Sequence, residues 1–356
     1  MIDLDQPPQF ADVDGLGMLE RILGLPEQIR DAWAMTRDLD LPDSHAEAAN
    51  IVICGMGGSA IGGDLVRSLA DDEARVPIAV VRGYDLPRYV DGRSLVVVSS
   101  FSGATEETLS AFDQALERGA RLIALTQGGP LLDRAQSHGV PVARFAFAGQ
   151  PREAIGYSMV LMLGVLCRLR YLSDRAPDVD RAATTLSQML ATIGPDVPAE
   201  SNPAKRLAQR LYGKLGLVYA GGLLADVARR WKGQLNENAK HWSFFEVLPE
   251  LNHNAVLGYQ FPTDIAPHVL VVTLSSSLNN PRVRVRERVT AELLARWGVA
   301  TEVVNARGTS PLEHVLSTSY VGDFVSYYLA LVNDVDPSDI NTITFLKARL
   351  ERENHG

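Results

Sequence analysis

The sequence has few cysteines, and its amino terminus lacks the features of a secretory signal. Its two cysteines, Cys54 and Cys167, lie in the apolar runs IVICG and GVLCRL without metal-ligand spacing. They predict small core side chains in a reducing compartment, which excludes a disulfide framework. The first residues, MIDLDQPPQF, contain no basic region followed by an apolar core. We therefore expect a cytoplasmic protein.

Basic residues and long apolar runs are also scarce. Only 34 basic residues oppose 43 acidic ones, and the net charge of −9 disfavours binding to a phosphate backbone, so we expect no nucleic-acid partner. The most apolar stretch, residues 154–167, is shorter than the roughly 18–20 residues of a membrane-spanning helix. It predicts a buried helix and no membrane partner. Any anionic ligand must be captured by local groups.

Short β-rich apolar runs alternate with helical runs between residues 49 and 147. Examples are NIVICGM before GGDLVRSLAD, and SLVVVSSF before ATEETLSAFDQALERG. Such alternation predicts a parallel sheet covered by helices on both faces. Residues 215–233 and 268–298 repeat the order of strand, turn and helix. The sequence therefore predicts an α/β protein with two tandem, doubly wound domains, each a mostly parallel sheet flanked by helices.

Composition also suggests where these domains begin and end. Residues 1–45 combine helical spacing with many acids and predict an amino-terminal helical arm. The first domain is expected at 46–172 and the second at 205–356. Between them, residues 173–204 are rich in Pro, Asp and Ser around a short helical segment, which is typical of a connection between domains.

The helix expected after Phe101 is the clearest single element of the sequence. Thr105, Leu109, Phe112 and Leu116 recur at helical spacing and predict the face that packs on the sheet. Gly119 supplies the expected stop.

A hydroxyl-rich turn, SSFSGATEET (99–108), joins that helix to the strand before it. In a parallel sheet this turn lies at the carboxyl end of a strand, where ligands bind. Free N–H groups at the start of the helix favour binding of an anion. Hydroxyl donors are added by Ser100, Ser102 and Thr105, and Gly103 allows the backbone to approach a ligand closely. The alternative is simple helix capping, for which Ser102 or Thr105 alone would serve. The number of hydroxyls favours phosphate binding.

A glycine-rich turn, GMGGSAIGG (55–63), follows the first strand. It satisfies the dinucleotide pattern G-x-G-x-x-A, but Arg82 stands near the end of the second strand where that pattern needs an acid. Gly57 and Gly58 would equally bring the backbone near a sugar, with Ser59 supplying a hydroxyl. Close packing of helix on strand is an equal alternative for each glycine.

The third candidate segment, residues 231–259, is rich in Asn, Glu, His and aromatic residues. It contains the triplets NEN around Glu237 and NHN around His253. Flanking amides can orient a side chain through hydrogen bonds, and an oriented Glu and His suit acid–base catalysis. A polar seam between domains or subunits is the alternative. His241 and His253 lack the spacing of metal ligands, so we expect no metal.

Together, GMGGSAIGGD, SSFSGATEET, WKGQLNENAKHW and LPELNHNAVLGY resemble the bifunctional phosphoglucose/phosphomannose isomerases, two-domain members of the sugar isomerase (SIS) superfamily. The resemblance runs from about residue 45 to 350. The serine turn alone identifies only the superfamily. The NEN triplet followed sixteen residues later by the histidine of NHN is more specific.

The resemblance implies an aldose–ketose isomerase acting on hexose 6-phosphates through an enediolate, with no cofactor. It implies that Glu237 moves the proton between C1 and C2 and that Arg152 lies near the enediolate. His253 would come from the neighbouring subunit of a homodimer and assist ring opening, and Lys347 matches a lysine near the carboxyl terminus. The residues implied to hold the sugar phosphate are Ser59, Ser100, Ser102 and Thr105.

Two departures from the family pattern bear on this expectation. Ile340 and Asn341 stand where a Thr-Pro pair is associated with use of mannose 6-phosphate, and isoleucine cannot donate a hydrogen bond. Phe101 and Ala104 replace a frequent Tyr and Asn.

Two other classes of function use only part of these features. A noncatalytic sugar-phosphate sensor would keep the serine turn without needing the four residues implied in catalysis. A dinucleotide-dependent oxidoreductase is indicated by the glycine turn alone. An isomerase accounts for all of the features, with glucose 6-phosphate as the expected substrate and fructose 6-phosphate as product.

Overall fold

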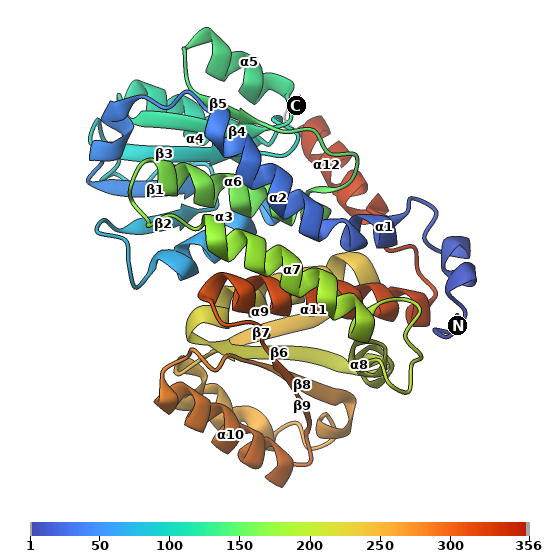
Figure 1. Ribbon diagram of the computed structural model, residues 1–356. Helices are drawn as coiled ribbons and strands as arrows, with labels where there is room; N and C mark the ends of the chain where they lie inside the picture. Colours follow the sequence, from blue (N-terminus) through green and yellow to red (C-terminus); the bar gives the residue numbers. More distant parts are fainter. Residues whose placement is uncertain (1, 354–356) are drawn as a thin grey trace.

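The computed structural model describes residues 2–353 and contains two parallel sheets with a layer of helices between them (Figure 1). The first sheet has the strand order β2-β1-β3-β4-β5 and the second β7-β6-β8-β9. Strands of the first sheet are β1 (Asn50–Cys54), β2 (Ile78–Val81), β3 (Ser94–Ser99), β4 (Arg121–Thr126) and β5 (Val142–Arg144). Those of the second are β6 (Leu215–Gly221), β7 (Ser243–Leu248), β8 (Val269–Ser275) and β9 (Ala300–Asn305). The predicted pair of doubly wound α/β domains is confirmed.

Apolar side chains on both faces of the first sheet explain why helices cover each face. Successive side chains of a strand point to opposite faces. In β1, Ile51 and Ile53 accordingly enter one core, and Val52 and Cys54 enter another. The first core is closed by α3 (Gly57–Ala70) and α6 (Ile155–Arg168), the second by α4 (Glu106–Glu117) and α5 (Gly129–Ser137). The carboxyl ends of the strands are left for the glycine-rich and hydroxyl-rich turns.

The second sheet is covered in the same way. Its inner face packs on α9 (Ala225–Ala239) and α11 (Pro311–Asn333), and its outer face on α10 (Pro281–Arg296). Within residues 2–353, α11 is the one helix long and apolar enough to cross a membrane, but 94% of its most apolar window is buried inside the structure. It is therefore the central core helix between the two sheets.

The amino-terminal arm and the connection between the domains pack against each other. The arm contains α1 (Met18–Leu23) and α2 (Leu25–Met35), and α2 lies on α6 and on α7 (Ala176–Ile193). The connection holds α7, an 18-residue helix and so longer than the short segment predicted, followed by α8 (Pro203–Leu211). Short 3-10 helices lie at η1 (Pro7–Asp12), η2 (Thr36–Asp38), η3 (Asp43–Glu47), η5 (Gly222–Leu224) and η8 (Ala266–His268).

Helix α4 confirms the predicted element but shifts its buried face. Phe112 is buried as expected, whereas Leu109 and Leu116 are only partly buried. The fully buried neighbours are the smaller Thr108, Ala111 and Ala115, because α4 lies close to the sheet. Gly119 follows the helix with φ +66°, as the predicted stop requires.

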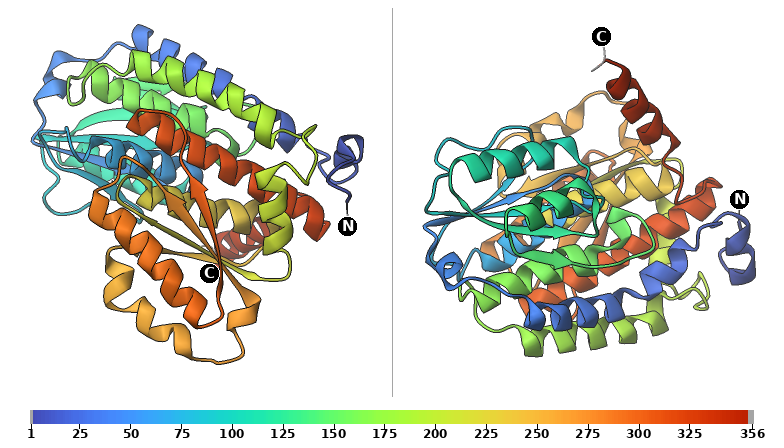
Figure 2. Two further views of the ribbon diagram at one scale, coloured as in Figure 1. Left: turned by 60° about the horizontal axis from the view of Figure 1, so that its bottom comes forward. Right: turned by 90° about the horizontal axis from the view of Figure 1, so that it is seen from above.

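The last helix, α12 (Asn341–Glu353), projects from the body of the protein (Figure 2, right view). Its apolar side chains Phe345 and Leu346 are 70% and 57% exposed. A helix with such a face is stabilised in proteins mainly by packing of that face. The described chain alone does not cover it.

A capping box at the start of α11 predicts one stability effect. The Glu313 carboxylate accepts hydrogen bonds from the backbone N–H of Thr309 (3.1 Å) and Ser310 (3.0 Å) and from the Thr185 hydroxyl (2.9 Å). Burial raises the pKa of Glu313, but these hydrogen bonds outweigh it and lower the pKa to about 2. We expect Glu313→Gln to reduce the free energy of unfolding at pH 7 by about 1–3 kcal/mol.

The pH dependence follows from the sign of that shift. A carboxylate with a lowered pKa in the folded protein contributes stability above its unfolded pKa of about 4.3, and loses it as the pH falls toward 2. Urea unfolding at pH 7 and pH 3 should therefore show a smaller difference between wild type and Glu313→Gln at the lower pH. The exposed Glu292→Gln on α10 serves as the control, and an equal difference at both pH values would contradict the role of Glu313.

Candidate active site

Two turns predicted from separate sequence segments meet at the carboxyl ends of β1 and β3. The Ser59 hydroxyl in the first turn of α3 accepts a hydrogen bond from the backbone N–H of Phe101 (3.2 Å). In the serine turn, the hydroxyls of Ser100 and Thr105 lie 3.0 Å apart. The structure thus brings Ser59 together with the hydroxyl-rich turn. The four candidate phosphate ligands are Ser59, Ser100, Ser102 and Thr105.

The hydrogen bonds of this turn argue against a simple capping role. Thr105 occupies the N-cap position of α4, but its side chain accepts no hydrogen bond from the helix backbone. The Ser102 hydroxyl accepts from the backbone N–H of Ala104, which precedes the helix (3.2 Å). The first N–H groups of α4 therefore have no side-chain cap and can donate to an anion.

The three candidate glycines have different roles. A Cβ on Gly58 would lie 2.7 Å from the carbonyl of Pro151, and one on Gly103 would lie 1.8 Å from the Gly128 oxygen. Both glycines therefore allow backbone segments of the protein to pack together, and their approach to a ligand stays a prediction. A Cβ on Gly57, which has φ +49°, meets only open space.

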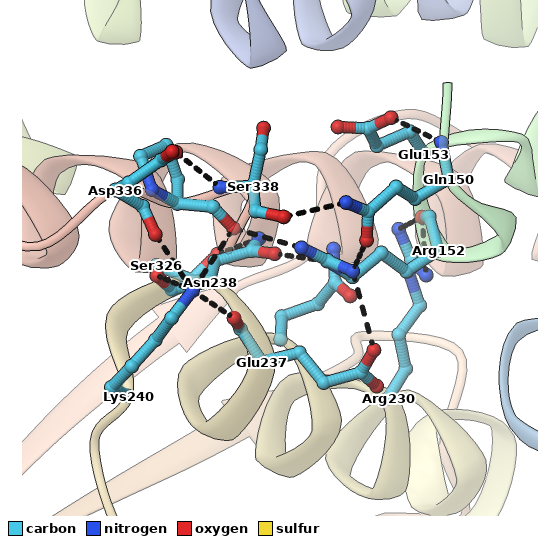
Figure 3. A network of polar contacts seen from close by, with 12 residues as sticks. Gln150, Arg152, Glu153, Arg230, Glu237, Asn238, Lys240, Ser326, Asp336 and Ser338 are labelled. Carbon is cyan, nitrogen blue, oxygen red and sulfur yellow. Dashed lines mark hydrogen bonds and ion pairs between the residues drawn. The ribbon is translucent and has the colours of Figure 1, made fainter. Parts of the chain in front are cut away.

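The approach of Pro151 to Gly58 places Arg152 beside the candidate base. Arg152 belongs to η4 (Pro151–Glu153), and its guanidinium lies 3.6 Å from the carboxylate of Glu237 near the end of α9 (Figure 3). Both side chains line a pocket of about 230 Å³ that also reaches Gly57 and Gly58. The candidate base and cation therefore share one pocket with the start of α3, whose Ser59 contacts the serine turn.

Arg152 is held rigidly. Its side chain donates to the amide oxygen of Asn238 (2.7 Å), to the carbonyl of Pro337 (2.8 Å) and to the side chain of Gln150 (Figure 3). Burial lowers the pKa of the 3%-exposed Arg152, while Glu237 raises it. Because an arginine stays protonated in proteins, the pocket keeps a fixed positive charge.

Two further cations hold the backbone around this pair. The buried Arg230 donates to the carbonyl oxygen of Arg152 (3.4 Å), and one of its guanidinium nitrogens contacts both carboxylate oxygens of Asp323 (2.7 and 3.0 Å). The Lys240 ammonium donates to the carbonyls of Glu237 (2.8 Å) and Asp336 (2.7 Å). These supports were not predicted from the sequence, although a lone aspartate within the apolar run SYVGDFVSYY indicates a buried partner.

The amides that flank Glu237 do not orient its carboxylate as predicted. The Asn236 amide oxygen accepts from the backbone N–H of Ser243 (3.0 Å), and Asn238 contacts Arg152 and Ser326. In the NHN triplet, Asn252 likewise contacts Thr290 of α10 (2.8 Å). The amides tie their segments to neighbouring elements because their side chains point away from the residue between them.

Two implied catalytic residues lie outside this pocket within the single chain. His253 ends η6 (Glu250–His253), before η7 (Ala255–Gln260), and is exposed; Lys347 is exposed on α12. Beyond Glu237, a second pocket of about 440 Å³ is lined by Lys240, His241, Ile340 and the start of α12. Its position extends the site toward the helix that carries Lys347.

The corresponding turn of the second domain is filled by its own side chains. The Asn279 amide accepts from the backbone N–H of Leu223 (3.1 Å) and donates to the carbonyl of Gly221 (3.0 Å). These groups occupy the place where Ser59 meets the serine turn in the first domain. Of the two equivalent turns, the one in the first domain is therefore the candidate phosphate-binding turn.

The fold and the pocket define a two-domain protein of the SIS type. Among solved structures, it is similar to a hypothetical protein from Thermus thermophilus (TM-score 0.76, 16% identity, covering 98% of this chain and 94% of that one). It is also similar to the C-terminal domain of glucosamine-fructose-6-phosphate aminotransferase from Francisella tularensis (TM-score 0.74, 15% identity, 90% and 98%). At these identities the likeness concerns the fold.

Sequence comparison identifies the family. Residues 200–350 match the family described as bacterial phospho-glucose isomerase C-terminal SIS domain. The chain is 38% identical to the bifunctional phosphoglucose/phosphomannose isomerase of Caldicellulosiruptor bescii over 94% of this chain and 98% of that protein. It is 32% identical to that of Thermoplasma acidophilum, over 85% and 90%. The chain belongs to the bifunctional phosphoglucose/phosphomannose isomerase family.

Proposed function

We propose that the protein is an aldose–ketose isomerase that interconverts glucose 6-phosphate and mannose 6-phosphate with fructose 6-phosphate. The observation that carries the proposal is the Glu237 carboxylate, 3.6 Å from the fixed guanidinium of Arg152 in a pocket that reaches the start of α3, where Ser59 contacts the serine turn. The names of the relatives from C. bescii and T. acidophilum support the same substrates.

The proposed chemistry uses each group of the pocket. Isomerisation removes a proton next to a carbonyl, and Glu237, with its side chain 37% exposed, is accessible to act as the base. Arg152 supplies the positive charge that stabilises the enediolate as it forms. The uncapped start of α4 and the four hydroxyls hold the phosphate at a distance from C1 and C2, which orients the sugar.

A homodimer would complete this site. The segment carrying His253 also exposes Leu257 and Phe261 (72% and 76%), and α12, which carries Lys347, exposes Phe345 (70%). Large apolar side chains exposed to this extent are typical of interaction surfaces. We therefore propose that His253 reaches the site of the neighbouring subunit. Sedimentation should give twice the chain mass, and a fully active monomer would contradict this arrangement.

Ile340 lines the second pocket and offers no hydrogen-bond donor to a sugar hydroxyl. Ser338, two residues earlier, is 3% exposed and its hydroxyl is buried, so it does not supply that donor to a ligand in the pocket. The names of the relatives are therefore what supports including mannose 6-phosphate among the substrates.

The direct test is a coupled assay of fructose 6-phosphate formation from each hexose 6-phosphate. We expect turnover of both glucose 6-phosphate and mannose 6-phosphate. One relative, from Sulfolobus acidocaldarius, is named D-glucosamine-6-phosphate 4-epimerase (31% identity over 65% of this chain), so glucosamine 6-phosphate is the informative comparison. Epimerisation of that sugar without isomerisation of the other two would refute the proposal.

A further inference from the structure

The candidate pocket carries more positive charge than the proposed reaction uses. Besides Arg152, its walls include Arg82, directly after β2, and Arg229 and Lys232 on α9. A hexose 6-phosphate has one phosphate, which the serine turn accommodates. In a chain of net charge −9, such a local excess of cations calls for a ligand or a structural partner.

Buried acids fix two of these cations without covering them. Arg82 pairs with Asp64, which is 4% exposed, and the Arg82 side chain stays 29% exposed. Arg229 lies 3.5 Å from Asp226 and 3.9 Å from Asp64, and its guanidinium stacks 5.0 Å from the centre of the Phe245 ring. A guanidinium oriented in this way is prepared to bind a phosphate.

Lys232 has no such partner. It is partly buried in the pocket wall and makes no ion pair with any acid in residues 2–353. Three cations thus face the pocket against two buried carboxylates, and the surplus lies on Lys232.

The strand order sets the distance between these cations and the serine turn. Arg82 follows β2 and the turn follows β3, with β1 and the start of α3 between them. Two strand spacings amount to about 10 Å. A six-carbon sugar with a phosphate at each end has a length of the same order, and the reacting carbons would then lie beside Glu237.

We propose that Arg82, Arg229 and Lys232 form a second anion-binding subsite for a phosphate group, so that the pocket binds hexose 1,6-bisphosphates across both subsites. The proposal rests on the assignment of the serine turn to the 6-phosphate. Glucose 1,6-bisphosphate is the informative ligand, because its esterified C1 cannot open to the aldehyde and it is held without reacting. Free phosphate is the other source of the same group.

The test compares inhibition constants for glucose 1,6-bisphosphate and glucitol 6-phosphate, which lacks the second phosphate. We expect the bisphosphate to bind at least about tenfold more tightly, and Lys232→Met to remove about tenfold of this preference. Arg82→Gln should reduce the preference for the bisphosphate by a similar factor. The control is Arg288→Gln at an exposed position on α10, which also removes one positive charge and should leave the preference unchanged. The readout is the ratio of the two constants, which a general loss of activity does not move.

The outcomes separate this proposal from the proposed function. If glucitol 6-phosphate binds but the bisphosphate binds no more tightly, or if Lys232→Met and Arg82→Gln keep the preference, the second subsite is wrong and the isomerase assignment stands. If glucitol 6-phosphate does not bind, the assignment of the serine turn fails and the subsite fails with it. Calorimetric titration of inorganic phosphate into the glucitol 6-phosphate complex tests whether the free ion binds. Binding to the wild type that is lost in Lys232→Met would support the same subsite.

Discussion

Glu237→Gln should lower kcat for hexose 6-phosphate isomerisation by about 10²–10⁴-fold while leaving sugar-phosphate binding close to that of wild type. Glutamine keeps the size of the side chain but cannot accept the proton from C1 or C2. Within residues 2–353, the Glu237 carboxylate makes one ion pair, the 3.6 Å contact with Arg152, and its side chain is 37% exposed. Substitutions at such positions usually change stability little, so the loss should concern the chemical step.

Proton exchange at C2, followed by NMR in deuterated water, reports that step directly. Calorimetry with glucitol 6-phosphate reports binding in the same variant. Glu246→Gln removes an exposed carboxylate from the neighbouring strand β7 and should leave both measurements unchanged. Undiminished exchange at C2 in Glu237→Gln would eliminate Glu237 as the base.

The fold could be predicted because its signals are local. Strands such as IVIC and LVVVS, apolar on both faces, cannot be stable unless helices cover both sides of the sheet. The recurrence of strand, turn and helix in the second half then indicates the second domain. The serine and glycine turns were placed correctly because the carboxyl ends of parallel strands meet at one edge of a sheet.

The support of the site could not be predicted because it depends on contacts between distant segments. Arg152 reaches Glu237 because Gly58 lets the Pro151 backbone pack on α3. That contact cannot be inferred from the spacing of residues in the sequence. The amide of Asn238 faces Arg152 and not Glu237 because helix α9 turns it toward η4.

The second large effect is expected on stability, from the buried ion pair of Arg230 and Asp323. Asp323→Leu should reduce the free energy of unfolding by about 3–5 kcal/mol, because it leaves the Arg230 guanidinium buried without a counter-charge. Arg230 and Asp323 are 3% and 4% exposed, and Gln234 also donates to Asp323 (2.6 Å). Burial raises the pKa of Asp323 above its ordinary value, and Arg230 and Gln234 oppose that rise, so the Asp323 carboxylate depends on these partners for its charge.

The double variant Arg230→Met, Asp323→Leu separates stability from catalysis. Replacing both charges by apolar groups of similar size should recover most of the stability lost in the single variant. It also removes the donor to the Arg152 carbonyl, so Arg152 loses part of its support beside Glu237. Because small displacements of a positioned group can reduce rates by up to about 10²-fold, kcat should stay low in the double variant. Urea unfolding and the coupled assay measure the two effects, and a double variant that recovers stability and full kcat together would show that the pair does not position Arg152.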